Sequence, residues 1–210
     1  MGMVDASIGG KTAIDYQNVK NIVGSFYLPQ YIVVDFRFLK TLPKKEYSNG
    51  LAEILKIGMV ADEEIYQIFL KNEQDSSIKE LVKRAIKVKL DFVKKDLHDQ
   101  NVRHALNFGH TFGHALESYY HIPHGQAVAL GMLIVSQNKV YFSDLKKIIL
   151  SIGLKNAFTF DAEGLMMYLS QDKKRTEKGI ELIEVEKVGT YSHSYKSLKE
   201  LYDLVSGGRI

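Results

Sequence analysis

Apolar side chains recur with helical spacing along most of the chain. The clearest stripe runs through residues 78–96, with apolar positions at 78, 81, 82, 85, 92 and 93, which is typical of one face of an amphipathic helix. Similar spacing predicts further helices, which lie over residues 43–56, 108–120, 126–141, 145–152 and 198–205. Pro123 and Gly125 separate two of them, and Gly153 ends another.

Two short segments have the β-branched composition of strands. Residues 31–36 follow Pro29 and are almost entirely apolar, which predicts a buried strand. Residues 180–188 begin with near-alternation of apolar and charged side chains and are followed by Gly189, which predicts a strand or hairpin. Residues 5–21 are polar and contain glycines, so we expect a loop. The pattern as a whole predicts a mainly α fold with a few short strands.

Composition narrows the class of protein. The chain has 210 residues, of which 45% are apolar and 25% charged, so it is neither a disordered tail nor a collagen-like rod. This length suits one large domain or two small ones. There is no cysteine, which excludes disulfides and leaves histidine and carboxylate as the available metal ligands.

The charge balance and the lack of targeting signals argue against a nucleic-acid-binding, a membrane-spanning or a secreted protein. The net charge is +3, with 28 basic and 25 acidic residues interleaved along the chain, so we expect no nucleic-acid partner. No apolar run approaches about 18 residues, the length that would indicate a membrane span. The first residues lack the basic and apolar regions of a signal peptide. We therefore expect a cytoplasmic protein without a membrane partner.

A glycine-rich segment near the start is a candidate anion-binding loop. Gly9-Gly10-Lys11-Thr12 resembles the end of a nucleotide-binding P-loop, but Asp5 occupies the position where that motif requires its first glycine. The alternative is a simple glycine turn with an exposed lysine. A polar loop carrying Asp5, Lys11, Lys20 and Asn21 suits a polyhydroxylated anion, because lysine is a strong partner for phosphate or carboxylate.

A histidine cluster is the main candidate for a metal site. His110 and His114 are spaced i, i+4 and share one helix face with Glu117, while His124 follows ten residues after His114. Two imidazoles and one carboxylate commonly hold a catalytic zinc-like ion. The carboxylate is either the nearby Glu117 or a remote one such as Glu53. The alternative is a set of histidines whose hydrogen bonds are satisfied within the helices.

Three charged residues lie at positions where the pattern predicts apolar side chains. Lys89 lies near the middle of the apolar stripe of residues 78–96, where desolvating an ammonium group is costly. Either its side chain extends to solvent, or the helix faces a cleft and Lys89 points at an anionic ligand. Glu53 and Lys56 are spaced i, i+3 in an otherwise apolar helix, and the simplest explanation there is an intrahelical ion pair.

Several segments together resemble the 3-dehydroquinate synthase family of the sugar-phosphate cyclase superfamily. They follow the family's order from the start of the chain to about residue 190 and lie at residues 3–12, 20–21, 38–43, 50–56, 103, 106–117, 124–129 and 172–174. This match is far more specific than any single motif.

The resemblance implies a set of site residues. It implies a Zn²⁺ or Co²⁺ ion held by Glu53, His110 and His124. It implies a substrate site lined by Asp5, Lys11, Asn21, Lys56, Lys89, Arg103, Asn107, His114 and one or both of Lys173 and Lys174. The residues implied to contact NAD are Lys11, Lys20, Asn21, Phe38, Leu39, Lys40 and Thr41.

The family resemblance also implies an activity. Members convert a seven-carbon keto-acid sugar phosphate, 3-deoxy-arabino-heptulosonate 7-phosphate, to 3-dehydroquinate and phosphate in the shikimate pathway, which makes them carbon–oxygen lyases. Full-length members are expected to be homodimers. The alternatives are another sugar-phosphate cyclase, a metal-dependent polyol dehydrogenase relative, or an isolated metal- and anion-binding domain without activity.

The chain also departs from the family pattern. Members begin with an α/β domain that binds NAD, whereas this sequence starts where that domain ends. We therefore expect residues 1–45 to form an interdomain and active-site segment and residues 46–210 a helical metal- and substrate-binding domain, inactive alone. Gln126 stands where members usually have glutamate, and Ile57 replaces a frequent histidine. The loss of a carboxylate beside His124 predicts weaker metal retention.

Overall fold

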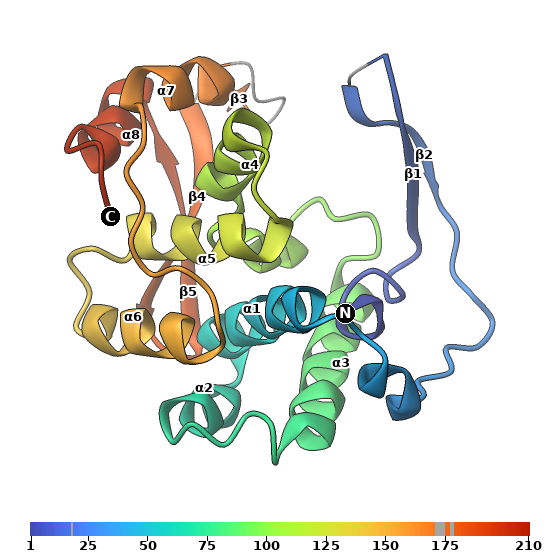
Figure 1. The fold of residues 1–210 in the computed structure, drawn as a ribbon. Helices are drawn as coiled ribbons and strands as arrows, with labels where there is room; N and C mark the ends of the chain where they lie inside the picture. The colour runs from blue at the N-terminus through green and yellow to red at the C-terminus, as the bar shows by residue number, and fades with distance from the viewer. Residues whose placement is uncertain (18, 171–174, 177–178) are drawn as a thin grey trace.

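The computed structural model describes residues 1–17, 19–170, 175–176 and 179–210, and most of them form one helical body (Figure 1). Its helices are α1 (Lys44–Ala61), α2 (Glu63–Leu70), α3 (Ile78–Lys95), α4 (His110–Tyr120), α5 (His124–Val135), α6 (Phe142–Ser151), α7 (Ala162–Ser170) and α8 (Leu198–Val205). The prediction of a mainly α fold with a few strands is confirmed.

The strands form two separate antiparallel sheets. One packs with the helices and has the order β3 (Arg175–Thr176), β4 (Gly179–Lys187), β5 (Thr190–Lys196). The other is a hairpin of β1 (Lys11–Tyr16) and β2 (Val19–Phe26) that stands beside the helical body (Figure 1). Three short 3₁₀ turns complete the fold: η1 (Gly2–Val4), η2 (Phe36–Lys40) and η3 (Val102–Asn107).

Helix α5 lies in the core because it is apolar on all sides. Every residue from Gly125 to Val135 is buried, and α5 packs against both α4 and α1. A Cβ atom added at Gly131 would lie 2.0 Å from the carbonyl oxygen of Gly109, and one added at Gly125 would lie 2.4 Å from the Cα of Asn49. These glycines let the three helices approach closely, so the first residues of α4 and α5 are held against α1.

The strongly periodic helices begin and end close to where the sequence predicts. The helix predicted over residues 78–96 is α3, and those predicted over 145–152 and 198–205 are α6 and α8. Gly153 ends α6 in the left-handed region at φ 80°, and the N–H of Leu154 donates to the carbonyl of Ile149 at 3.1 Å. Among the described residues, no helix is both long and apolar enough to span a membrane.

The strand predicted over residues 31–36 is wrong. The segment has no strand partner and leads into η2. Tyr31 is 86% and Val33 89% exposed, whereas Val34 and Phe36 pack partly against the helical core. Among the described residues the segment has no neighbouring strand to pair with. The side chain of Asp35 instead accepts a hydrogen bond from the backbone N–H of Arg37 at 2.9 Å, which caps η2.

The loop predicted over residues 5–21 is also wrong in part. Residues 11–16 and 19–26 pair as a hairpin, with Lys11 opposite Phe26 and Ile14 opposite Val23. The side chains that the structure describes in it are exposed, so the sequence carried little of the pattern that marks a half-buried strand. The strand predicted over 180–188 is confirmed as β4, which forms a hairpin with β5.

Three helical features differ from the prediction. The helix predicted over residues 126–141 ends at Val135, because successive turns replace it; the N–H of Lys139 donates to the carbonyl of Ser136 and that of Phe142 to Lys139. Helices α2 and α7 were not predicted. Both are short, at 8 and 9 residues, so each offers only two turns of periodic pattern.

Candidate metal and anion site

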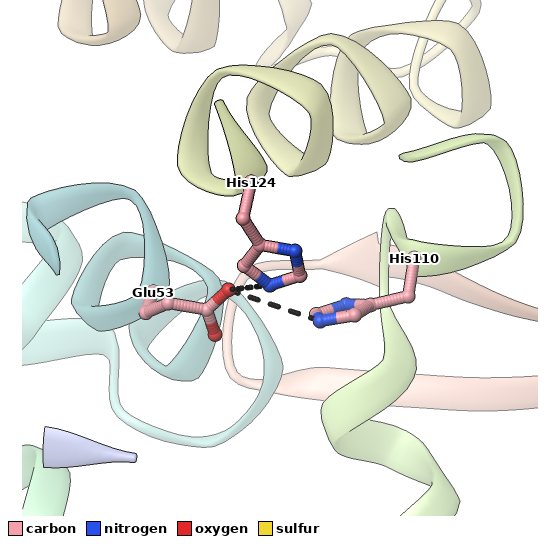
Figure 2. A group of neighbouring side chains, drawn as sticks. All are labelled: Glu53, His110 and His124. Atoms are coloured by element: carbon pink, nitrogen blue, oxygen red, sulfur yellow. Dashed lines mark ion pairs between the residues drawn. The ribbon is translucent and has the colours of Figure 1, made fainter. Parts of the chain in front are cut away.

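Glu53, His110 and His124 bring three potential metal ligands together from three helices (Figure 2). One ligand atom from each lies within 4.8 Å of the others. The Glu53 carboxylate oxygen Oε1 is 3.1 Å from Nε2 of His124 and 3.8 Å from Nε2 of His110. Glu53 comes from the middle of α1, whereas His110 and His124 are the first residues of α4 and α5. The close packing of these helices creates the cluster.

The donor set fits a divalent metal ion. Oε1 of Glu53 is buried and accepts no well-formed hydrogen bond from any described residue, although both imidazoles face it. Leaving a buried carboxylate oxygen without a partner is costly. An ion bound between these three atoms would satisfy the oxygen, and two imidazoles with one carboxylate form a common ligand set for catalytic zinc.

Glu53 and His110 are already in the protonation states that bind a metal, a carboxylate and a neutral imidazole, whereas His124 is protonated. Burial raises the pKa of Glu53, but Lys56 and the imidazoles outweigh it and hold that pKa well below its usual range. Burial, aided by Lys56, keeps the pKa of His110 well below its usual range, so this imidazole is neutral. The nearby carboxylates of Glu117 and Glu53 raise the pKa of His124 to about 9, so a metal ion must displace a proton there.

Neighbouring groups orient the three candidate ligands. Glu117 Oε2 lies 2.9 Å from Nδ1 of His124, and Lys56 donates to Oε2 of Glu53 at 2.6 Å. Between the two carboxylates that the sequence left open, the geometry therefore puts Glu53 in the cluster and Glu117 behind His124, in the position of an orienting partner. The intrahelical ion pair expected between Glu53 and Lys56 also forms.

A cationic pocket of about 120 Å³ adjoins the cluster. It is lined by Asp5, Lys11, Lys56, Lys89, Asp99, Arg103, Leu106, Asn107 and His110. His110 thus belongs to both the metal cluster and this pocket. Four cationic side chains around so small a volume form a site for an anion such as phosphate or carboxylate.

Lys89 is a buried lining residue of this pocket. It is 5% exposed, and its ammonium group donates to the carboxylate and the backbone carbonyl of Asp5. Burial lowers the pKa of Lys89; the contact with Asp5 opposes this, and Lys56 and Arg103 reinforce it. The solvent-exposed alternative is therefore wrong, and the lysine faces a cleft.

Arg103 explains the glycine turn near the start of the chain. It is 4% exposed and donates from Nη1 to the carbonyls of Gly9 at 3.3 Å and Leu97 at 3.0 Å. A Cβ atom added at Gly9, where φ is 99°, would lie 2.2 Å from Nη2 of Arg103. Gly9 therefore leaves room for the guanidinium group, and the resemblance to a P-loop has no structural counterpart.

The remaining sequence-predicted residues are less completely placed. The ring centroid of His114 lies 5.2 Å from that of His110 and 6.1 Å from that of His124, so it borders the cluster without joining its ligand atoms. Phe38, Leu39 and Lys40 lie in η2, and Thr41 follows it. Lys20 and Asn21 are in β2, with side chains outside the described part of the structure. Lys173 and Lys174 lie outside the described residues.

Two carboxylates at or near the pocket, Asp99 and Asp96, were not predicted from the sequence, in contrast to Asp5. Asp99 lines it and forms an ion pair with Lys11. Asp96 accepts hydrogen bonds from the backbone N–H groups of Gln100, Asn101 and Arg103, which fixes the turn that presents Arg103. The polar run at residues 96–101 was the only local signal for either residue.

A second missed cluster lies beside this turn. Glu181 on β4 lies 2.7 Å from Nδ1 of His104 and 2.7 Å from Nδ1 of His193 on β5. Nε2 of His104 lies 2.8 Å from the carbonyl oxygen of Asp99. The cluster links the β4–β5 sheet to the wall of the cationic pocket, and no short-range pattern could have joined residues so distant in sequence.

A wider cleft of about 420 Å³ opens beside the metal cluster. Glu53 and His124 line it together with Asp5 and residues 121–125. A small molecule in this cleft would therefore reach both the candidate metal ligands and the N-terminal segment. Its volume is within the range of small-molecule sites.

The hydrogen bonds of the Gln126 side chain are to Lys155 and not to His124. Its side-chain amide donates to the carbonyl of Lys155 at 2.8 Å and its amide oxygen accepts from the N–H of Lys155 at 2.7 Å. The partner that lies against His124 is Glu117. The expectation that Gln126 weakens metal retention by removing a carboxylate beside His124 therefore has no support in the geometry. The role of Gln126 is to join α5 to the turn after α6.

Gln126→Glu is expected to destabilise the fold by about 1–3 kcal/mol, because a carboxylate cannot donate to the Lys155 carbonyl and leaves it without a partner. Urea unfolding of the two proteins measures this difference. Gln30→Glu, at an exposed position, is the matched control and should change stability by less than about 0.5 kcal/mol. Equal stability of Gln126→Glu and the unmodified chain would contradict the amide assignment.

Comparisons with known proteins identify the family. The family model for the 3-dehydroquinate synthase C-terminal domain matches residues 50–175, and the model for the N-terminal domain matches residues 1–49. A 3-dehydroquinate synthase from Picrophilus torridus is 37% identical over 221 residues, covering 99% of this chain and 64% of the relative. One from Corynebacterium jeikeium is 38% identical, covering 90% of this chain and 56% of the relative.

Solved structures show the same fold at lower identity. The 2-epi-5-epi-valiolone synthase ValA from Streptomyces hygroscopicus subsp. jinggangensis, with NAD⁺ and Zn²⁺ bound, superposes with a TM-score of 0.83 at 22% identity, covering 98% of this chain and 63% of that one. A 2-deoxy-scyllo-inosose synthase complexed with carbaglucose-6-phosphate, NAD⁺ and Co²⁺ gives a TM-score of 0.77 at 18% identity, with coverages of 98% and 63%.

These matches confirm the resemblance noted in the sequence. The chain spans 56–64% of the length of the Corynebacterium and Picrophilus relatives, and its C-terminal family match extends over the candidate metal ligands and the residues of the cationic pocket from Lys56 to Asn107. On this evidence the chain belongs to the 3-dehydroquinate synthase family.

Proposed function

We propose that the chain is the metal- and substrate-binding part of a 3-dehydroquinate synthase, a carbon–oxygen lyase of the shikimate pathway. The observation that carries the proposal is the position of His110, which is a candidate metal ligand and also lines the cationic pocket. A substrate bound there would present its reacting carbon to the metal and its anionic groups to the cations. Curated relatives with this activity are 37–38% identical.

The proposed reaction converts 3-deoxy-arabino-heptulosonate 7-phosphate to 3-dehydroquinate and phosphate. One hydroxyl is transiently oxidised to a ketone by NAD, and phosphate is then eliminated. The ketone takes the hydride back from the reduced cofactor, and the ring closes by aldol addition, so the net change is redox-neutral. A divalent ion, Zn²⁺ or Co²⁺, held by Glu53, His110 and His124 would supply Lewis-acid polarisation of that hydroxyl.

The chain's own residues position the substrate. Lys56, Lys89, Arg103 and Asn107 line the pocket and would hold phosphate and carboxylate groups at fixed points, which lowers the entropic cost of reaction. His114 borders the metal cluster and would handle a proton near the departing phosphate. Lys173 and Lys174 are assigned to substrate by family resemblance alone.

NAD binding is assigned to residues 1–45 and to a further domain. In this proposal Lys11, Lys20, Asn21 and the segment 38–41 contact NAD, as the resemblance implies. Residues 14–38 expose large apolar side chains, including Ile14, Val23, Phe26, Tyr27, Tyr31 and Val33. A patch of this kind marks an interaction surface, which supports an interdomain role for this segment. The whole enzyme is proposed to be a cytoplasmic homodimer.

The test is turnover by a fused protein. The 210 residues alone are expected to give no phosphate release from the heptulosonate phosphate with NAD and Zn²⁺. Fusion in frame to the N-terminal part of the Picrophilus torridus relative is expected to give turnover, because it supplies the NAD-binding domain. Rapid turnover by the 210 residues alone would contradict the domain assignment.

The same fused protein separates the alternative activities. A hexose 6-phosphate without a carboxylate serves as the competing substrate. Preference for it would favour another sugar-phosphate cyclase, the activity class of ValA and its neighbours. A folded fusion that binds NAD and Zn²⁺ but releases no phosphate from either substrate would contradict the proposed function.

A further inference from the structure

A second large hollow, of about 430 Å³, lies between the start of α1, the turn before α5 and the turn after α6. Its apolar wall consists of Ile122, Pro123, Leu154 and Phe158. None of the three candidate metal ligands lines it, and neither do the cationic residues of the anion pocket. The hollow shares Lys45, Asn49, Ile122 and Pro123 with the wider cleft beside the metal cluster but is not lined by the candidate ligands themselves, and its volume suits a small organic molecule.

The rim of this hollow is cationic. Lys44, Lys45 and Lys155 line it, and none of them forms an ion pair with another described residue, in contrast to Lys11, Lys56 and Lys89 in the anion pocket. Three ammonium groups beside an apolar wall attract a ligand that carries a negative charge on an apolar body.

Polar groups without partners line the same hollow. Ser48 is 5% exposed and lines it, and its hydroxyl forms no hydrogen bond with any described residue. Helix α1 begins directly beside it at Lys44, with Pro43 before it and no side-chain cap on its first N–H groups. A hydroxyl and N–H groups without partners among the described residues are suited to a carboxylate, which accepts hydrogen bonds from both.

We propose that this hollow binds a small organic acid with a ring-sized apolar body. Its carboxylate would lie among Lys44, Lys155 and the Ser48 hydroxyl, and its body would lie against Ile122, Leu154 and Phe158. The site takes a carboxylate rather than inorganic phosphate, because the apolar wall offers nothing to a fully hydrated anion. The proposal does not depend on the reaction assigned to the metal site.

The experiment uses benzoate as the probe and the 210-residue chain after removal of metal by chelation. Amide chemical shifts are followed during titration with benzoate, its neutral analogue benzamide, and acetate, which lacks the ring. Benzoate is expected to give saturable shifts at Ser48, Gln126 and Gly153. Benzamide and acetate should each bind at least about tenfold more weakly than benzoate, because benzamide lacks the negative charge and acetate lacks the apolar ring.

Variants test the position of the charge. The double variant Lys44→Met, Lys155→Met should weaken benzoate binding about tenfold, the effect of losing two partly exposed charge contacts. Lys79→Met, on the exposed first turn of α3, is the matched control and should leave binding unchanged. Both variants are checked for an unchanged amide spectrum before titration.

Any of four results would overturn the proposal. These are titration without saturation, benzamide binding as well as benzoate, unchanged affinity of the double variant, and shifts centred on Arg103 and Lys89 rather than on Ser48 and Gly153. The last result would mean that benzoate binds only in the cationic pocket beside the metal cluster.

Discussion

The 210-residue chain is expected to bind one divalent ion, Zn²⁺ or Co²⁺, and His110→Ala is expected to weaken binding more than about 100-fold. Removing His110 takes away one of three protein ligands, which costs more than the 10–100-fold typical of losing an orienting partner. Metal content after dialysis, followed by competition with a chelator, measures the difference.

Two further variants make this measurement specific. Glu117→Gln should weaken metal binding by about 10–100-fold, because Glu117 orients His124 without being one of the three clustered ligands. His98→Ala is the control, since His98 contacts Phe26 outside the cluster and should leave affinity unchanged. Equal metal content in the unmodified chain and His110→Ala would disprove the ligand assignment.

The sequence indicated a candidate metal site without showing which residues form it. The i, i+4 spacing of His110 and His114 indicated a cluster, yet only His110 contributes a ligand atom to it. The third candidate ligand, Glu53, lies 57 residues before His110, and its only local signal was a carboxylate in an apolar helix. Spacing along one helix cannot report which carboxylate a different helix brings near, so Glu117 and Glu53 stayed open until the helices were packed.

In the anion pocket, too, the sequence predicted features within one helix but not contacts between distant segments. Periodicity alone placed Lys89 on the buried face of α3, because a helix of 18 residues fixes the direction of each side chain. Its partner Asp5 and the pair formed by Lys11 and Asp99 join segments more than 80 residues apart, and no periodic pattern carries such contacts.

The errors in the predicted strands have one physical cause. Strand propensity reflects packing against a neighbouring strand and a core, more than an intrinsic preference of the backbone. Residues 31–36 have the composition of a strand but no pairing strand among the described residues. The strands β1 and β2 pair with each other, although their described side chains are exposed. Only β4 combines composition with burial, and it was predicted correctly.

Lys89→Met is expected to weaken the binding of inorganic phosphate by about 1.5–3 kcal/mol, or roughly tenfold to a hundredfold, the range for hydrogen bonds to charged groups. Methionine keeps the unbranched apolar stem and removes the charge. Calorimetric titration with phosphate measures the loss. Lys87→Met, exposed on the same helix, is the control and should bind phosphate as the unmodified chain does.

Stability distinguishes a binding lysine from a structural one. Lys89 is desolvated and lies near Lys56 and Arg103, so removing its charge relieves both burial and repulsion. Its partner Asp5 is 40% exposed at the side chain and can return to water. We therefore expect Lys89→Met to unfold at the same urea concentration as the unmodified chain, or at a higher one. A loss of more than about 1 kcal/mol with unchanged phosphate affinity would instead make Lys89 a residue that fastens the N-terminal segment to α3, and would remove it from the anion site.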